Sequence, residues 1–290
     1  MGKYKFLNIL TEEFFKQPNI QNLNNAEIGR MVNADLTTVR LYRQKFNLIS
    51  PRQMCYKKSS VCRTHPLLSW QYGLIAGLLL GDGYMGRNKY GKYVYFGTGH
   101  GPAQKEYTYF LREMFSNVCS KGVRKVVTVQ SNSTCYYFTT VGNHPDLIKI
   151  YSYFYDQTGR KRITQKWLNL LTPAGLVLWF YDDGHRTDGR KYYFLATHCF
   201  SLEEHKLLRR HLYKKFGIKT SIIKCRYYEK TYYQLYFAKS TIDVFEKHLT
   251  DYYLPTFKYK IHPSALPSSE TEPGACWSKY PNNEDTVRTS

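Results

Sequence analysis

The sequence predicts an α+β fold in which two similar halves follow a small helical segment. The first observation is a pair of apolar helices that each end in an acid followed by glycine, and their acids, Asp82 and Asp183, are 101 residues apart. The second is that similar elements follow each helix in the same order. The third is charge, because 42 Lys+Arg against 22 Asp+Glu give a formal net charge of +20, which indicates a polyanionic partner.

Composition narrows the class of protein further. The 28 tyrosines, interleaved with basic residues, suit contacts with phosphate, sugar and base faces, although tyrosine also favours strands. We find no signal peptide and no apolar run near 18 residues, which predicts a soluble, intracellular protein with no membrane partner. The cytoplasm and an organelle matrix both remain open as its compartment.

The 7 cysteines are odd in number and scattered, and thiols should be mostly reduced inside cells. Cys55, Cys62 and His65 are close enough in sequence to consider zinc. Their spacing lacks a paired CxxC and a clear fourth ligand, which favours unligated thiols over a zinc site.

Residues 1–50 predict a helix-turn-helix-like DNA-binding segment. In "NNAEIGRMVNADLTTVRLYRQKFNL" (24–48), apolar positions at helical spacing flank a turn at 32–34, and Asp35 can cap the second helix. A second helix of this kind enters the DNA major groove with its polar face. The residues expected to contact DNA there are Thr37, Arg40 and Gln44. A small helical cap with a polar outer face is the alternative.

Four further segments complete the predicted organisation. Residues 51–68 contain Pro, Ser, Lys and Arg without periodicity and predict a basic linker. The two repeats are expected at 69–158 and 159–263. The tail at 264–290 is rich in Pro, Ser, Glu and Asn, which predicts disorder.

The elements of the repeats can be matched one by one. The first helix is "LIAGLLLGDG" (74–83), and its counterpart is "TPAGLVLWFYDDG" (172–184), where Thr172 is a good N-cap. The later elements are basic helices at 105–115 and 202–216, aromatic alternating strands at 133–142 and 230–240, and helices at 145–154 and 242–253. Each half thus runs helix, strands, helix, strands, helix. Two such halves predict a monomer with an internal pseudo-two-fold axis, which a DNA duplex also has.

An acid at the end of an apolar helix needs a compensating cation. Burying a carboxylate is costly, and the helix C-terminus already carries partial negative charge. A late lysine follows in each half, Lys161 in "RKRIT" and Lys260 in "KYKIH", at 79 and 77 residues after the acid of that half.

The motif sequences resemble a known family. "IAGLLLGDG" (75–83) is similar to the nine-residue motif that names the LAGLIDADG homing endonucleases, and "LVLWFYDDG" (176–184) has the same register. The chain therefore resembles the single-chain, two-motif branch of that family over about residues 66–263. The resemblance implies that the motif helices form the interface between two pseudo-symmetric repeats, whose sheets form a saddle over the DNA major groove.

The resemblance also implies a metal-dependent active site. Asp82 and Asp183 would meet at the bottom of the saddle and bind Mg²⁺ (or Mn²⁺), with the backbone carbonyls of Gly81 and Asp182 as supplementary ligands. The side chain of Asp182 is expected to be an interface residue without a catalytic role. Lys161 and Lys260 would be the basic residues of the two active sites, with Arg162 and Lys258 as their alternatives.

DNA reading is expected from the strands around 84–98, 124–141, 186–199 and 220–238, because alternation sends one set of side chains into the groove. The predicted contacts are Arg87, Lys89, Arg186, Arg190, Lys191, Lys224 and Arg226. His198, in "LATHCF", is a further candidate for contact with a base or a water molecule.

The function predicted on this resemblance is that of a site-specific homing endonuclease encoded by a mobile intron, which makes double-strand breaks with short 3′ overhangs in a long double-stranded DNA target. An intron RNA maturase, with the intron RNA as partner, is the first alternative. A non-cleaving transcription regulator that joins a helix-turn-helix to this fold is the second. The presence of both Asp82 and Asp183 argues against the second, because a pure binder has no need of paired acids at helix ends.

Overall fold

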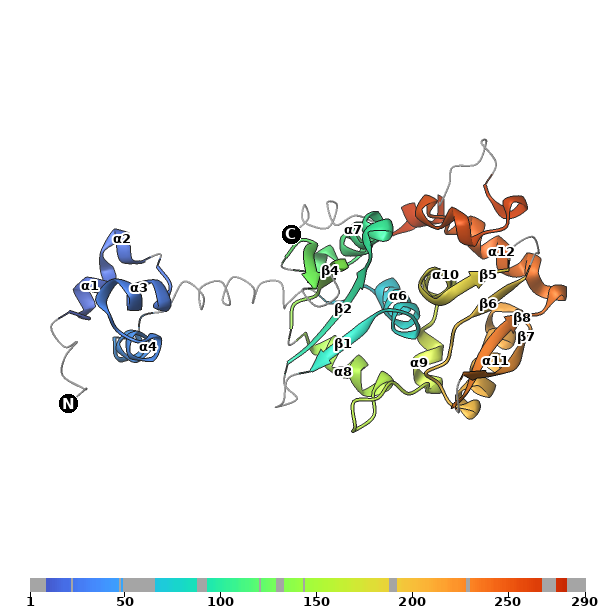
Figure 1. The fold of residues 1–290 in the computed structure, drawn as a ribbon, viewed down its shortest axis with the longest axis horizontal. Helices are drawn as coiled ribbons and strands as arrows, with labels where there is room; N and C mark the ends of the chain where they lie inside the picture. Colours follow the sequence, from blue (N-terminus) through green and yellow to red (C-terminus); the bar gives the residue numbers. More distant parts are fainter. Residues whose placement is uncertain are drawn as a thin grey trace. The chain divides into compact units, whose positions relative to one another are not determined.

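A computed structural model describes residues 9–21, 23–46, 48, 66–87, 93–119, 121–128, 133–142, 144–187, 192–227, 230–267 and 275–280. The zinc candidates Cys55, Cys62 and His65 lie outside these residues. The chain divides into two compact units, residues 1–64 and 65–290. The larger unit has the mixed helix and antiparallel-sheet architecture that the sequence predicts (Figure 1).

Four short helices form the N-terminal unit: α1 Glu12–Lys16, α2 Pro18–Gln21, α3 Asn25–Val32 and α4 Leu36–Lys45. The α3–turn–α4 pair follows the predicted pattern, with Asn33 in the left-handed conformation between the helices. Asp35 caps α4 by accepting hydrogen bonds from the backbone N–H groups of Thr37 and Thr38 at 2.7 and 2.9 Å. A Cβ on Gly29 would lie 2.5 Å from the Ala34 carbonyl oxygen, so the turn needs glycine on α3.

Each half of the larger unit contains the same succession of elements. In the first half these are α6 Ser69–Leu80, β1 Tyr84–Arg87, β2 Val94–His100, α7 Lys105–Met114, β3 Arg124–Thr128, β4 Ser133–Thr139 and α8 Pro145–Phe154. In the second they are α10 Pro173–Asp183, β5 Gly184–Arg186, β6 Tyr193–Leu195, α11 Leu202–Phe216, β7 Thr220–Tyr227, β8 Lys230–Phe237 and α12 Ile242–Asp251. A short helix, α9 Gln165–Leu170, joins the halves. Short 3-10 turns are η1 Pro102–Gln104, η2 Ser116–Val118, η3 Lys239–Thr241, η4 Pro255–Lys260, η5 Pro263–Ala265 and η6 Ala275–Lys279.

The two sheets have the same topology. Each has four antiparallel strands, in the orders β1-β2-β4-β3 and β5-β6-β8-β7. One face of each sheet packs on helices and contributes fully buried residues such as Phe96 and Phe138 in the first half and Leu195 and Leu235 in the second. Neighbouring residues along each strand point to the other, open face.

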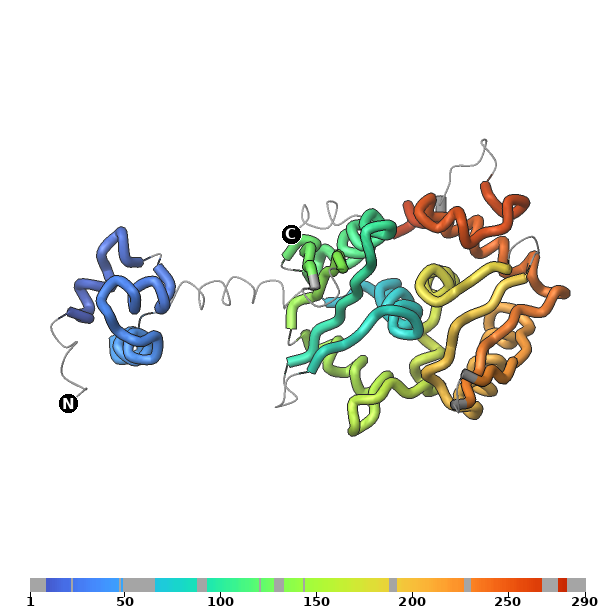
Figure 2. Tube along the Cα trace, viewed as in Figure 1, coloured from blue at the N-terminus to red at the C-terminus, as the bar shows by residue number. Residues whose placement is uncertain are grey.

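The two halves meet at α6 and α10, which lie side by side between the sheets (Figure 2). Glycines allow this close approach. A Cβ on Gly77 would lie 1.9 Å from the Gly175 carbonyl oxygen, and a Cβ on Gly175 would lie 2.1 Å from the Gly73 carbonyl oxygen. Small residues on both helices therefore set the interface, although Trp179 and the other large side chains of α10 are also buried.

Parts of the predicted disordered tail are ordered. Residues of η5 and η6 pack on the larger unit, and the Trp277 ring lies 5.0 Å from the rings of both Phe110 and Tyr252. The Tyr280 ring packs against the Trp70 ring in a tilted arrangement, with the ring centroids 4.9 Å apart. Two aromatic side chains gain enough apolar burial to order a segment whose overall composition is polar.

Among the residues that the structure describes, no helix is long and apolar enough to cross a membrane.

Candidate active site

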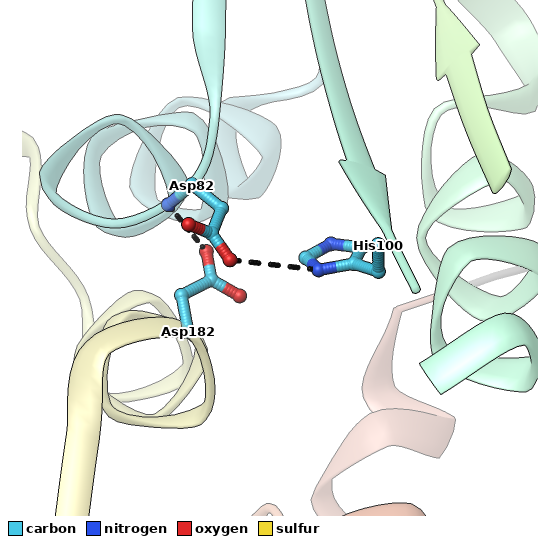
Figure 3. A group of neighbouring side chains, drawn as sticks. All are labelled: Asp82, His100 and Asp182. Atoms are coloured by element: carbon cyan, nitrogen blue, oxygen red, sulfur yellow. Dashed lines mark hydrogen bonds and ion pairs between the residues drawn. The ribbon is translucent and has the colours of Figure 1, made fainter. Parts of the chain in front are cut away.

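The ends of the two motif helices bring the acids together. After α6, the backbone N–H of Asp82 donates to Asp182 Oδ2 at 3.1 Å, and the hydroxyl of Tyr107, on α7, donates to Asp182 Oδ1 at 3.1 Å. Figure 3 shows the Asp82 and Asp182 side chains facing one another. A Cβ on Gly81 would lie 2.5 Å from the Asp182 Cβ, so glycine at 81 makes room for the larger acid opposite.

Lysines hold the carbonyl oxygens at both helix ends. Lys161 Nζ donates to the carbonyls of Gly81 at 3.2 Å and Gly83 at 2.8 Å. Lys260 Nζ donates to the carbonyls of Tyr181 at 2.5 Å and Asp182 at 3.1 Å. Cations at the negative ends of helices are the favourable arrangement, and the acids beside them gain from the same charge.

The alternative basic residues lie elsewhere. Arg162 pairs with Asp156 at 3.0 Å, and 46% of its side chain is exposed. Lys258 is exposed, whereas Lys260 is buried. The structure therefore brings Lys161 and Lys260 to the motif helices.

Lys161 belongs structurally to the first half. It pairs with Tyr155 in an isolated antiparallel bridge and bonds to the carbonyls after α6, although the predicted boundary assigns residues from 159 onward to the second repeat. The first half therefore extends at least to Lys161. The chain reverses direction after α8, so that Lys161 lies antiparallel to Tyr155, and the composition of this segment does not predict the reversal.

Burial and mutual repulsion raise the pKa values of two acids of the site, Asp182 and Asp183. Burial raises the pKa of Asp183 to about 7, and the charge of Asp82 adds to the increase. Burial and the charge of Asp82 also raise the pKa of Asp182 well above its ordinary value. Burial lowers the pKa of both Lys161 and Lys260, while the nearby acids oppose that decrease. The two ammonium groups thus compensate the acids only in part.

His100, at the end of β2, is a site residue that the sequence did not reveal. Its side chain is 1% exposed, its Nδ1 lies 3.7 Å from Asp82 Oδ2, and its Nε2 lies 3.1 Å from Thr98 Oγ1. The ligand atoms of Asp82, His100 and Asp182 lie within 4.8 Å of one another (Figure 3). Tyr107 was likewise missed, because only the packing of α7 brings its hydroxyl to Asp182. His198, the histidine that the sequence indicated, is exposed and lies 2.6 Å from the Gln234 side-chain amide.

Strand register places the predicted sheet cations on the helix-covered side. Arg87 pairs with the buried Val94 and lies 5.3 Å from the Tyr151 ring of α8. Arg186 pairs with the buried Tyr193. Lys224 and Arg226 also lie on the helix-covered face. Along β7 they alternate with Ile223 and Cys225, which are on the open face. The register with β8 puts them on the same face as the buried Leu235 and Phe237. Lys89, Arg190 and Lys191 lie outside the described residues.

The open face of the first sheet is aromatic. A hollow of about 560 Å³ beside Asp82 is lined by Tyr84, Tyr95, Tyr137, Arg124 and other residues. The Arg124 guanidinium lies 4.6 Å from the centre of the Tyr137 ring. The arginine on this face is therefore one that the sequence analysis did not select.

This architecture defines a class of protein: two pseudo-symmetric α+β halves that meet at a pair of helices ending in acids. Residues 72–245 match the model of the LAGLIDADG DNA endonuclease family, and the chain belongs to that family in its single-chain, two-motif form. The predicted family and fold class are confirmed.

The relatives of this chain include two mRNA maturases and a probable DNA endonuclease. The chain is 28% identical over 226 residues to the cytochrome b mRNA maturase bI2 of Debaryomyces hansenii, which covers 72% of this chain and 80% of that protein. The protein of the same name from Saccharomyces cerevisiae is also 28% identical, and the chain spans 51% of its length. A probable intron-encoded DNA endonuclease 3 of Mycosarcoma maydis is 30% identical over 129 residues, 43% of this chain and 92% of that protein.

A solved structure shares the fold. The homing endonuclease I-WcaI, determined bound to its DNA recognition sequence, superposes with a TM-score of 0.62 at 22% identity, covering 76% of this chain and 96% of that chain.

Proposed function

We propose that the protein is a site-specific endonuclease that cuts both strands of a double-stranded DNA target. The observation that carries this proposal is the convergence of acids from two helix ends that are packed at glycine contacts, with a lysine at each end, of which Lys260 is buried and Lys161 is partly buried. A protein that only binds DNA gains nothing from burying carboxylates at helix C-termini, where they are least stable. Membership of the LAGLIDADG DNA endonuclease family supports the same conclusion.

The donor set fits divalent metal ions. The carboxylates of Asp82 and Asp183 and the carbonyl oxygens of Gly81 and Asp182 are hard oxygen ligands of the kind that Mg²⁺ prefers. When bound, such ions polarise the scissile phosphates and lower the pKa of attacking water. We propose Mg²⁺ as the physiological ion, with Mn²⁺ as a substitute.

The residues of the chain itself prepare this site. Lys161 and Lys260 each hold two motif carbonyls, which fixes the helix ends and places a positive charge near the scissile phosphates. The half-exposed Asp82 leaves the site open to solvent and DNA, while the Asp182 carboxylate is fixed by two donors. Each half would serve one strand.

Cleavage selection tests the proposal. The protein is incubated with a randomised duplex library and Mg²⁺, and the new ends are sequenced. Asp82→Asn and Asp183→Asn should abolish double-strand cleavage and leave binding of the selected target largely intact. Glu203→Gln, at a side chain that is 77% exposed on α11, is the matched control and should cleave as the wild type does. Undiminished cleavage by either Asn variant would overturn the assignment.

The N-terminal unit would lengthen the DNA contact. Thr37, Arg40 and Gln44 are all exposed on α4, the second helix of the predicted motif, and the charge-bearing face of such a helix suits the major groove. This proposal is separate from cleavage, because none of these residues belongs to the acid cluster.

A maturase role is the second candidate, and one surface favours it. Lys206, Arg209, Arg210 and Lys219 line a hollow of about 730 Å³, together with the exposed Tyr213. Most of these residues belong to α11, which packs on the face of the second sheet that carries Leu235, so this surface is separate from the open face. Two of the relatives named above are mRNA maturases.

The two roles can be separated by charge reversal. Arg209→Glu with Arg210→Glu should weaken binding of the intron transcript and leave DNA cleavage unchanged if this surface binds RNA phosphates. Lys121→Glu, at an exposed residue of the first half, controls for the change in net charge. Equal RNA affinity in both variants would remove the support for the maturase role.

A further inference from the structure

The two halves of the site differ at one buried position. Tyr84 pairs with Gly97 in the first sheet, and its counterpart His185 pairs with Phe194 in the second, so the register matches His100 with Thr197. Thr197 is fully buried, and its Oγ1 lies 2.7 Å from His205 Nε2. His205 Nδ1 in turn lies 2.8 Å from the Ser201 carbonyl oxygen, so both nitrogens of that imidazole have partners.

The imidazole of His100 is arranged differently. Its Nε2 faces the buried hydroxyl of Thr98, and its Nδ1 faces the carboxylates of Asp82 and Asp182. An Nε2–H that donates to Thr98 leaves the lone pair of Nδ1 directed at the two acids. Metal-bound histidines have this arrangement, in which the second ring nitrogen donates to a fixed acceptor.

We propose that Asp82, His100 and Asp182 form one asymmetric cation site with two oxygen ligands and one nitrogen ligand, and that this site binds a transition-metal dication such as Mn²⁺ more tightly than Mg²⁺. The inference rests on the proposed function, which places a metal at Asp82, and it adds the carboxylate of Asp182, from α10, and the imidazole of His100 as ligands.

Distances support a site of this size. Bonds of about 2.1 Å place neighbouring ligand atoms about 3.0 Å apart and opposite ones about 4.2 Å apart. The three ligand atoms lie within 4.8 Å of one another, and His100 Nδ1 is 3.7 Å from Asp82 Oδ2, so an ion bound between these two as neighbours draws them together by about 0.7 Å. The Asp182 carboxylate is already oriented by Tyr107 and by the Asp82 N–H, and Asp82 is half-exposed, which leaves a path for the ion.

The ligand chemistry decides the preference. Mg²⁺ takes oxygen ligands almost alone, while imidazole nitrogen suits the first-row transition metals, whose affinity for such sites rises from Mn²⁺ onward. The second half has a threonine where His100 stands, and among the described residues the only cluster of three such ligands is the one at Asp82. Mn²⁺ should therefore load the first half before the second.

Metal binding without DNA tests this inference. Full-length protein is titrated with Mn²⁺ and followed by electron paramagnetic resonance, and Mg²⁺ affinity is measured by competition. His100→Ala should weaken Mn²⁺ binding by about tenfold or more and bring it close to the affinity for Mg²⁺. His198→Ala, at an exposed histidine of the second half, should bind Mn²⁺ as the wild type does.

A second measurement needs no variant. Pulsed spectra of Mn²⁺ bound to the wild-type protein should show hyperfine coupling to a directly bound nitrogen, which His198→Ala retains. Absence of that coupling, or an equal loss of Mn²⁺ and Mg²⁺ affinity in His100→Ala, would overturn the proposal. Because no DNA is present, these outcomes are independent of whether the protein cleaves.

Discussion

Removing one lysine should slow the cutting of one DNA strand. Lys260→Met keeps the length of the side chain and deletes the ammonium that donates to two carbonyls at the end of α10. Hydrogen bonds to a charged group contribute about 1.5–3 kcal/mol each to stability. The variant no longer has to bury an ammonium group, which offsets part of that loss. We therefore expect the free energy of unfolding to fall by about 2 kcal/mol. A lost electrostatic contact in the transition state costs about 3 kcal/mol, or roughly a hundredfold in rate.

The strand bias follows from the contacts. Among the described residues, the Lys260 ammonium donates to carbonyls of the second motif, and the Lys161 ammonium donates to carbonyls of the first. Lys161→Met should therefore slow the opposite strand. A hundredfold gap is wide enough for nicked DNA to accumulate before the linear product. A duplex target labelled separately on each strand measures both rates in one reaction.

Two neighbouring cations serve as controls. Arg162→Met and Lys258→Met remove charge within two residues of the tested positions, where Arg162 pairs with Asp156 and Lys258 is exposed. Both should cleave the two strands at wild-type rates. If Lys161→Met and Lys260→Met slow both strands equally, or slow neither, the assignment of one lysine to each strand is wrong.

Three further predictions concern the interface, the acids and the N-terminal unit. Gly77→Ala puts a Cβ 1.9 Å from the Gly175 carbonyl oxygen and should cost about 1–3 kcal/mol in urea unfolding, while Gly122→Ala, whose Cβ meets nothing within 4 Å, should cost far less. In metal-free protein, Asp183 has a folded pKa of about 7 against about 3.9 unfolded, so folded protein keeps a proton that the unfolded chain releases. Stability should therefore fall from about pH 4 to pH 7, and thermal melts of Asp183→Asn should show a smaller fall, because Asp182, whose pKa is also raised, still contributes to it. Arg40→Ala should weaken the affinity for the target DNA by about tenfold or more and shorten the protected footprint on one side. Arg30→Ala, on α3, should leave both the affinity and the footprint unchanged.

The sequence was sufficient for the motif helices and for the lysines. The apolar run of each helix, its acid and its glycine all lie within a dozen residues, so local pattern determines them. Lys161 and Lys260 could be found because the repeat supplies two copies at similar spacing, and each copy supports the other. The exposure of Arg40 and Gln44 on α4 also follows from helical spacing alone.

Contacts set by strand register could not be predicted in this way. The alternation of side chains along a strand divides them into two faces. It does not determine which face packs on the helices when charged residues lie near the ends of the strand. Arg87 and Lys224 are exposed although they lie on the helix-covered side, so a charged side chain at these positions does not indicate which face of the strand is buried. His100 reaches Asp82 only because β2 runs antiparallel to β1, and neither partner's neighbourhood in sequence indicates it.

The charges at the helix ends explain why this site should bind a dication. Three carboxylates, those of Asp82, Asp182 and Asp183, face two ammonium groups, so the lysines leave a negative excess if all three acids are ionised. Burial, and after it the charge of Asp82, raises the pKa of both Asp182 and Asp183, so each of these acids holds a proton more readily than a solvated carboxylate does. A divalent cation relieves the negative excess more completely than a proton does and must displace any proton that the acids hold. Metal uptake should therefore release protons into the buffer, and calorimetry in buffers of different ionisation enthalpy would measure that release near pH 7 directly.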